Sequence, residues 1–225
     1  MELYDPYLVC FGDSLTAGYQ RNPYVDHQEE DTPYGDFLQK WVATRAQIVV
    51  TGICGEVTDD MVKRFSRDVV TRRPQVTVIL GGTNDLGLGV SPGRISQNLE
   101  QLYQLSIEAG IQPVGVTVPS IRVETGEGDP GGLHKSGSKP SIPPWLKFHI
   151  DQRLVLNRQI VEMCRALTIP CLDLFSETVE GSDQLLASRY SSDGLHLNTA
   201  GYEAFARLVW RHLLAIPFGD ILSEG

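Results

Sequence analysis

The stretch YLVCFGDSLTAG, residues 7–18, decides the fold that we expect for this chain. Its first five residues are apolar and end at a glycine, a pattern typical of a buried strand. Ser14 follows where that strand stops, and the carboxyl ends of strands in an open α/β sheet are where ligands bind. A serine there is either a nucleophile or the cap of the turn or helix that follows. This stretch alone leaves both interpretations open.

Composition and charge exclude several classes of protein. The chain of 225 residues is long enough for one domain with a large core, and we predict a single domain over residues 1–225. The 19 Lys and Arg against 28 Asp and Glu give a net charge of −9, which argues against nucleic acid or an anionic membrane surface as the main partner. No segment approaches the roughly 18 apolar residues of a membrane span.

Two further features predict a cytoplasmic protein. Residues 1–6 contain neither the basic nor the apolar region of a signal peptide. The four cysteines form no C-x-x-C pair, and three of them lie within or beside apolar segments, as buried thiols in a reducing compartment do.

Strand and helix patterns alternate along the chain. Expected strands cover residues 7–11, 46–51, 76–80, 112–118 and 171–174, and expected helices cover 34–45, about 58–72, 91–109, about 154–167 and 200–214. On the later helices, the expected inner faces carry Ile95, Leu99, Leu102, Leu105 and Ala109, and then Leu154, Val161, Cys164 and Leu167. The alternation predicts an α/β fold with a mostly parallel five-stranded sheet and helices on both faces.

Residues 120–148 interrupt this rhythm. They contain five glycines and four prolines and are too long for an ordinary connection. We predict that they form a lid or one wall of a substrate cleft; the alternative is a disordered excursion.

An aspartate and a histidine stand three residues apart between the last expected strand and the last expected helix. Gly194 allows a tight bend that brings the Asp193 carboxylate beside the His196 ring. The carboxylate would hold one ring N–H, and the other ring nitrogen would accept a proton from Ser14. Taken alone, His196 is better explained as a structural loop histidine.

Acyl transfer also needs hydrogen-bond donors for the developing oxyanion. Gly55 lets a backbone N–H approach a substrate closely, and Asn84 offers a side-chain amide, although either is also an ordinary turn residue. These residues and Ser14 follow three consecutive strands, and Asp193 and His196 lie in the final loop. Their convergence at one sheet edge predicts a hydrolytic site.

Four short blocks carry a family resemblance: GDSL at 12–15, GICGE at 52–56, GTND at 82–85 and DGLH at 193–196. The chain resembles the SGNH hydrolases, the GDSL lipase/esterase superfamily, in order and spacing from residue 7 to about 212. The resemblance implies Ser14 as nucleophile, His196 as base and Asp193 as its orienting acid. It also implies an oxyanion hole made of the Ser14 and Gly55 N–H groups and the Asn84 amide. The implied fold is a flavodoxin-like three-layer α/β/α sandwich.

Other classes of site lack their motifs. There is no G-x-x-x-x-G-K-[ST], no G-x-G-x-x-G after the first strand, no G-x-S-x-G, and no H-x-x-x-H or H-E-x-x-H spacing. We therefore predict no cofactor and no metal.

The sequence thus predicts a serine esterase that hydrolyses small short-chain acyl or aryl esters through a covalent acyl-enzyme. Open alternatives are a lysophospholipase or acyl-thioesterase, a carbohydrate O-acetyl esterase, and a non-catalytic small-ligand-binding protein on the same fold. The predicted partner is a small-molecule ester.

Overall fold

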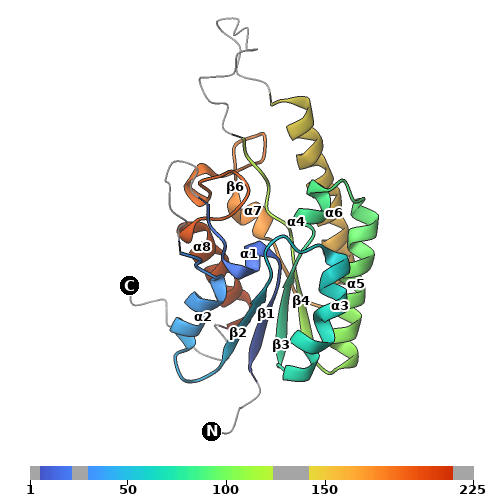
Figure 1. Ribbon diagram of the computed structural model, residues 1–225, viewed down its shortest axis with the longest axis vertical. Coiled ribbons are helices and arrows are strands. Elements are labelled where there is room, and N and C mark those ends of the chain that lie inside the picture. The colour runs from blue at the N-terminus through green and yellow to red at the C-terminus, as the bar shows by residue number, and fades with distance from the viewer. Residues whose placement is uncertain (1–5, 22–29, 124–141, 215–225) are drawn as a thin grey trace, which may run out of the picture.

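Five parallel strands form the sheet at the centre of the protein (Figure 1). The computed structural model describes residues 6–21, 30–123 and 142–214. The strands are β1 (Leu8–Gly12), β2 (Ile48–Gly52), β3 (Val76–Leu80), β4 (Gln112–Val116) and β5 (Cys171–Leu172). Their order is β2-β1-β3-β4-β5, and every pair is parallel. The predicted α/β fold is confirmed.

The sheet is built around β1 and β3, whose residues are all buried. Their sequences, LVCFG and VTVIL, are continuous apolar runs because helices cover both faces of a parallel sheet. Chain order reverses on either side of the β1–β3 pair, which makes the carboxyl end of this pair the topological switch point where such folds bind ligands.

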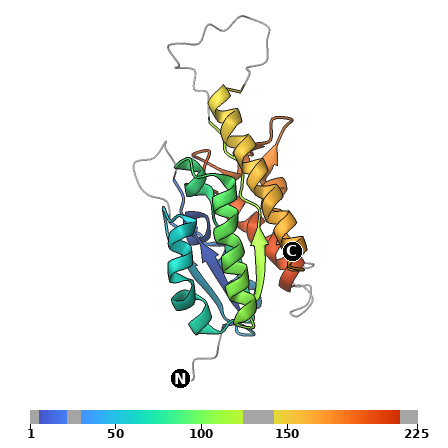
Figure 2. The same cartoon turned by 90° about the vertical axis from the view of Figure 1, so that its right-hand side faces the viewer.

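Long helices complete a three-layer sandwich (Figures 1 and 2). One layer contains α2 (Tyr34–Val42) and α8 (Thr199–Val209), and the other contains α3 (Thr58–Asp68), α5 (Pro92–Glu108) and α6 (Pro144–Ala166). One aromatic contact joins the sheet to α3, and another joins the two helices of the opposite layer. The Phe11 ring meets Phe65 of α3 edge-on with centroids 5.1 Å apart, and the Tyr34 ring of α2 lies 4.0 Å from Phe205 of α8.

Several short elements were not predicted. They are the helices α1 (Ser14–Ala17), α4 (Thr83–Gly87) and α7 (Leu174–Thr178), the antiparallel pair β6 (Val179–Glu180) and β7 (Leu185–Leu186), the 3-10 turns Val70–Arg72 and Ser188–Tyr190, and the π-helical turn Trp210–Leu214. Two of them, α1 and α4, begin directly after β1 and β3 and carry residues of the candidate site.

Several predicted boundaries are wrong, most of all the start of α6, which was expected at about residue 154 and lies at Pro144. The helix expected over 34–45 ends at Val42, where Ala43 adopts a positive φ of 53°, and the helix expected to reach about residue 72 ends at Asp68. The last five residues of the predicted 120–148 loop belong to α6, since a proline fits the first helical turn, where its missing N–H has no intrahelical partner. Residues 124–141 lie outside the described residues, so the lid remains a prediction.

The buried faces of two helices also differ from those predicted. The apolar pattern of α6 selected Leu154, Val161, Cys164 and Leu167, of which only the cysteine is buried, and on α5 the predicted Ala109 is exposed. The buried stripe of α6 includes Arg153 and Asn157 instead. Asn157 exchanges two hydrogen bonds of 2.8 and 3.0 Å with the backbone of Val118, and Arg153 Nε donates to the Pro119 carbonyl at 3.2 Å. A hydrophobicity pattern misses such a face because two of its members are polar.

Gly52→Ala is expected to lower the free energy of unfolding by ~1–3 kcal/mol. A Cβ at this position would lie 2.2 Å from the backbone nitrogen of Ala17, so α1 would have to move. Urea unfolding followed by circular dichroism measures the change. The control is Gly93→Ala in α5, where an added Cβ meets nothing within 4 Å and stability should stay equal or rise slightly. Equal stability of Gly52→Ala and wild type would contradict the close packing.

Candidate active site

Ser14 is the first residue of α1 and lies at the carboxyl end of β1. The helix is capped by Asp13, whose Oδ1 accepts the Leu15 N–H at 2.9 Å. Gly18, with a φ of 83°, ends the helix and donates its N–H to the Ser14 carbonyl at 3.1 Å. The interpretation of Ser14 as the cap is therefore wrong. The Ser14 side chain is not used for capping, and it lies on the tight turn between β1 and α1.

Asp193 and His196 form a hydrogen-bonded pair in the loop before α8. His196 Nδ1 lies 2.7 Å from Asp193 Oδ2, while Asp193 Oδ1 accepts the N–H groups of Leu195 at 2.9 Å and His196 at 2.7 Å. Burial tends to raise the pKa of Asp193, but these hydrogen bonds outweigh it and the net pKa is lowered. The carboxylate is thus held ionised against the imidazole, and its contacts fix the orientation of the ring.

The His196 ring lies beside the segment that holds Ser14. It meets the Tyr19 ring edge-on with centroids 4.7 Å apart, and Tyr202 of α8 donates to the Tyr19 carbonyl at 2.7 Å. His196 also lies near enough to Asp13 to lower the pKa of that carboxyl. Within the described residues, the Ser14 side chain makes no hydrogen bond to the ring, so transfer of a proton to His196 remains a prediction.

Gly55 lies in the connection between β2 and α3. Its φ is 78°, a conformation that favours glycine, and an added Cβ would meet nothing within 4 Å. The connection is tied to β1 because Ile53 donates its N–H to the Gly12 carbonyl at 3.0 Å. The N–H groups of Ser14 and Gly55 donate to no residue that the structure describes, so both are free for a ligand.

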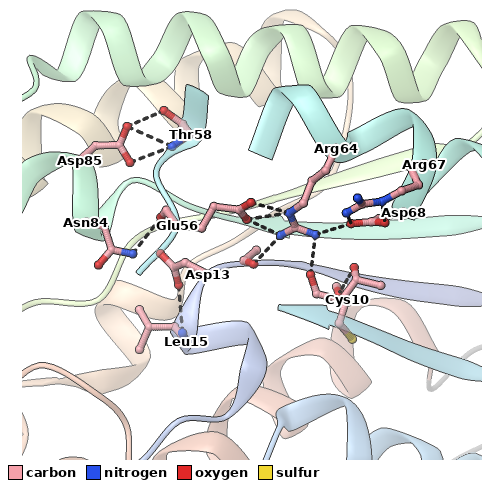
Figure 3. Close-up of polar contacts among 12 residues, drawn as sticks. Cys10, Asp13, Leu15, Glu56, Thr58, Arg64, Arg67, Asp68, Asn84 and Asp85 are labelled. Atoms are coloured by element: carbon pink, nitrogen blue, oxygen red, sulfur yellow. Dashed lines mark hydrogen bonds and ion pairs between the residues drawn. The ribbon is translucent and has the colours of Figure 1, made fainter. Parts of the chain in front are cut away.

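Asn84 stands in the first turn of α4, which follows β3. Its Nδ2 donates one hydrogen to the Glu56 carbonyl at 2.8 Å, which leaves the second N–H of the amide for a ligand (Figure 3). The neighbouring Asp85 carboxylate accepts the Thr58 N–H at 3.0 Å and the Thr58 hydroxyl at 2.6 Å, at the start of α3. Four hydrogen bonds therefore join the α4 turn to the β2–α3 connection and to the first residue of α3.

The structure also reveals polar residues that the sequence analysis did not select. Arg64 of α3 is buried and binds the Glu56 carboxylate, and Asp85 anchors the start of the same helix. The available signal for Arg64 was its place beside Met61 and Phe65 on one face of α3, since a charged residue on an apolar stripe needs a partner. In the described ranges no group of three or more His, Cys, Asp or Glu side chains could hold a metal ion, and the role of a cofactor stays untested.

Comparison with known proteins places this arrangement in a family. The sequence model of the GDSL-like Lipase/Acylhydrolase family matches residues 10–204. The uncharacterized lipoprotein YqeF of Bacillus subtilis (strain 168) is 31% identical over 121 residues, which are 51% of this chain and 49% of that protein. The matched segment thus spans about half the length of that relative.

Solved structures share the fold. A GDSL-like lipase from Bacteroides thetaiotaomicron superposes with a TM-score of 0.69 at 20% identity, over 93% of this chain and 90% of that one. A carbohydrate acetylesterase from Sinorhizobium meliloti gives a TM-score of 0.68 at 15% identity, over 93% and 98% of the two chains. At these identities the similarity concerns the fold alone. Because the family match covers most of the chain, the protein belongs to the GDSL-like lipase/acylhydrolase family, as its four sequence blocks predicted.

Proposed function

We propose that the protein is a serine esterase that hydrolyses small esters with short-chain acyl or aryl groups through a covalent acyl-enzyme. The observation that carries the proposal is the Asp193–His196 pair, 2.7 Å apart, beside the turn that presents Ser14 at the switch point of the sheet. A nucleophile, a base and a group that orients the base are the parts that this chemistry requires.

In the proposed first half-reaction, Ser14 Oγ attacks the ester carbonyl carbon while His196 Nε2 takes the hydroxyl proton. Asp193 holds the opposite ring nitrogen and stabilises the imidazolium that forms. The carbonyl oxygen becomes an oxyanion that accepts hydrogen bonds from the free N–H groups of Ser14 and Gly55 and from the remaining amide N–H of Asn84. His196 then protonates the departing alcohol, and the acyl group stays on Ser14.

In the second half-reaction a water molecule replaces the alcohol. His196 takes a proton from the water as it attacks the acyl carbon, and the oxyanion forms again among the same donors. Collapse of the tetrahedral intermediate returns the proton to Ser14 and releases the carboxylic acid.

Three exposed apolar side chains lie close in sequence to the proposed site residues and favour an ester with an apolar part. Ile53, Leu88 and Leu195 are 44%, 75% and 36% exposed, and each lies within four residues of Gly55, Asn84 or His196 in the sequence. Apolar side chains this close in sequence to the proposed site residues are the kind of surface that an acyl or aryl group needs. This supports a small apolar ester over a polar sugar acetate.

A carbohydrate O-acetyl esterase is the second candidate, favoured by the fold shared with the Sinorhizobium meliloti acetylesterase. Initial rates on C2 to C12 p-nitrophenyl esters, lysophospholipid, acyl-CoA and acetylated xylose separate the candidates. We expect the highest kcat/KM on C2 to C4 or aryl esters. A preference for acetylated xylose, lysophospholipid or acyl-CoA would replace the proposed substrate class, and no turnover of any of them would favour a binding protein.

The cytoplasmic location also remains a prediction. No helix among the described residues is long and apolar enough to cross a membrane. The Bacillus subtilis relative is described as a lipoprotein. Fractionation of the source cells with an antibody against this chain tests the prediction.

Ser14→Ala is expected to abolish hydrolysis of p-nitrophenyl acetate, because it removes the proposed nucleophile. Labelling by a fluorophosphonate should disappear with it, while the circular dichroism spectrum stays that of the wild type. The control is Ser176→Ala in α7. Ser176 is exposed and its backbone N–H donates to the Asp173 side chain, so this variant should keep activity and labelling. Full activity in the Ser14 variant would refute the mechanism.

Asn84→Ala is expected to reduce kcat for p-nitrophenyl acetate by on the order of 10²-fold or more, since one oxyanion donor is lost. KM should change much less, because the donor acts mainly on the charge that develops in the transition state. Steady-state kinetics measure both constants. An unchanged kcat would remove Asn84 from the site.

Because the Asp13 carboxyl is buried, we expect the stability of the protein to depend on pH. The carboxyl is fully buried, and among the described residues its Oδ2 has no hydrogen-bond partner. Burial raises its pKa to about 7, against the lowering effects of the Leu15 N–H and His196 and with smaller raising effects from Asp85 and Glu56. The folded protein therefore keeps a proton that the unfolded chain releases above pH ~4, so this group's contribution to stability falls as pH rises from ~4 to ~7.

Asp13→Asn removes that titration and leaves an amide oxygen for the Leu15 N–H. We expect the variant to gain stability relative to wild type between pH 5 and pH 8, by on the order of 1–4 kcal/mol. Urea unfolding at the two pH values measures the difference. A difference independent of pH would show that Asp13 titrates normally in the folded protein.

A further inference from the structure

The Arg64 side chain projects from α3 into the edge of the sheet where the candidate site lies (Figure 3). It is 6% exposed. Its guanidinium donates to the Gly12 carbonyl at 2.9 Å and to the Thr51 carbonyl at 2.8 Å, at the ends of β1 and β2. Its Nε lies 2.7 Å from both carboxylate oxygens of Glu56. One buried cation thus ties together two strand ends and the connection that follows β2.

Two of these contacts, those with Gly12 and Glu56, fall close in sequence to a proposed oxyanion donor. Gly12 lies two residues before Ser14, and Glu56 directly follows Gly55. The Glu56 backbone carbonyl accepts the Asn84 amide at 2.8 Å, which sets the direction of the remaining amide N–H. The guanidinium therefore contacts Gly12 and Glu56 directly, and Glu56 in turn contacts Asn84. In this way it links the segments that carry all three donors.

The β2–α3 connection depends on such contacts because little else holds it. Gly55 is exposed, an added Cβ there would meet nothing within 4 Å, and residues 53–57 form neither helix nor strand. Within the described residues, its ties to the sheet are the Ile53–Gly12 hydrogen bond and the contacts of Glu56 with Arg64 and Asn84. Small displacements of catalytic groups cost large factors in rate, so this connection has to be fixed precisely.

The contacts require an arginine. The planar fork carries five donors, which here reach two carbonyls, the Glu56 carboxylate and Asp68 Oδ2 at 3.0 Å. Its flat face also lies over the Phe11 ring, 4.2 Å from the centroid. A lysine would keep the charge but could not make these contacts together.

We propose that Arg64 and Glu56 are positioning residues that hold the Ser14, Gly55 and Asn84 donors in register for the oxyanion. The inference rests on the proposed function and adds to it the residues that organise the oxyanion hole. Neither side chain touches the substrate; both act through the backbone of the β1 and β2 ends and through the Asn84 amide.

The test removes both charges together, because deleting Arg64 alone would leave Glu56 buried and unpaired. In the Arg64→Met, Glu56→Gln variant we expect kcat for p-nitrophenyl acetate to fall ~10–100-fold with KM changed less than ~3-fold. The matched control, Lys63→Met with Asp60→Asn, removes an exposed ion pair of the same helix and should leave kcat unchanged.

A combined variant shows whether the effect passes through the oxyanion hole. Added to Asn84→Ala, the Arg64→Met, Glu56→Gln changes should reduce kcat by clearly less than they do in the wild type, since one donor that they position is already absent. Losses that multiply fully would overturn the inference.

Arg64→Lys decides the question if the double variant does not fold. This change keeps a cation for Glu56 but loses the fork that reaches both strand ends. We expect the variant to fold and to lose ~10-fold in kcat with little change in KM. Wild-type kcat in folded Arg64→Lys, or in the folded double variant, would refute a positioning role.

Failure of the proposed function gives a different result. Fluorophosphonate labelling of the wild type and its loss in Ser14→Ala establish the nucleophile independently of Arg64. If the wild type neither labels nor hydrolyses esters, the esterase proposal fails. If it does both and the Arg64 variants match it, only the positioning inference fails.

Discussion

The pairing of β1 with a parallel neighbour on each side is the constraint on which the rest of the structure depends. Gly12 is in register with Gly52 of β2 and with Leu80 of β3, so three strands end side by side. The backbones are close there: a Cβ on Gly12 would lie 2.2 Å from the Leu80 carbonyl oxygen. Residues far apart in the sequence therefore emerge together at one edge of the sheet.

Backbone carbonyls at the ends of β1 and β2 accept hydrogen bonds from a buried charged side chain. Where the ladder stops, the Gly12 carbonyl accepts the Ile53 N–H, and Arg64 donates to both the Gly12 and the Thr51 carbonyls. A buried guanidinium in turn needs anions, and Glu56 and Asp68 provide them. The same edge is thus held by hydrogen bonds between charged and backbone groups, and apolar packing dominates only deeper in the sheet.

The loop that holds Asp193 and His196 is organised by local contacts and placed by distant ones. Asp193 binds the ring of His196 and two backbone N–H groups within three residues, so the pair is organised by its own loop. Contacts with other segments set the position of this loop in the protein. Arg122, after β4, donates its N–H to the Gly194 carbonyl at 2.8 Å, and Tyr202 of α8 binds the Tyr19 segment beside the ring.

The sequence by itself determined the α/β fold, the strand centres and the family, because apolar runs, glycine turns and the Asp193–His196 spacing are local patterns. The sequence also selected Ser14, Gly55 and Asn84, which follow the ends of three neighbouring strands, and Asp193 and His196, which lie in the loop before α8. Only the tertiary structure decided that Asp13 caps α1 and that the Arg153 and Asn157 side chains of α6 are buried. It also decided that Arg64 donates to the end of β1, next to the candidate site. Arg64, Arg153 and Asn157 have partners many positions away. A periodic pattern reports the spacing of apolar side chains, and it does not report the distant backbone group that makes a buried polar side chain stable.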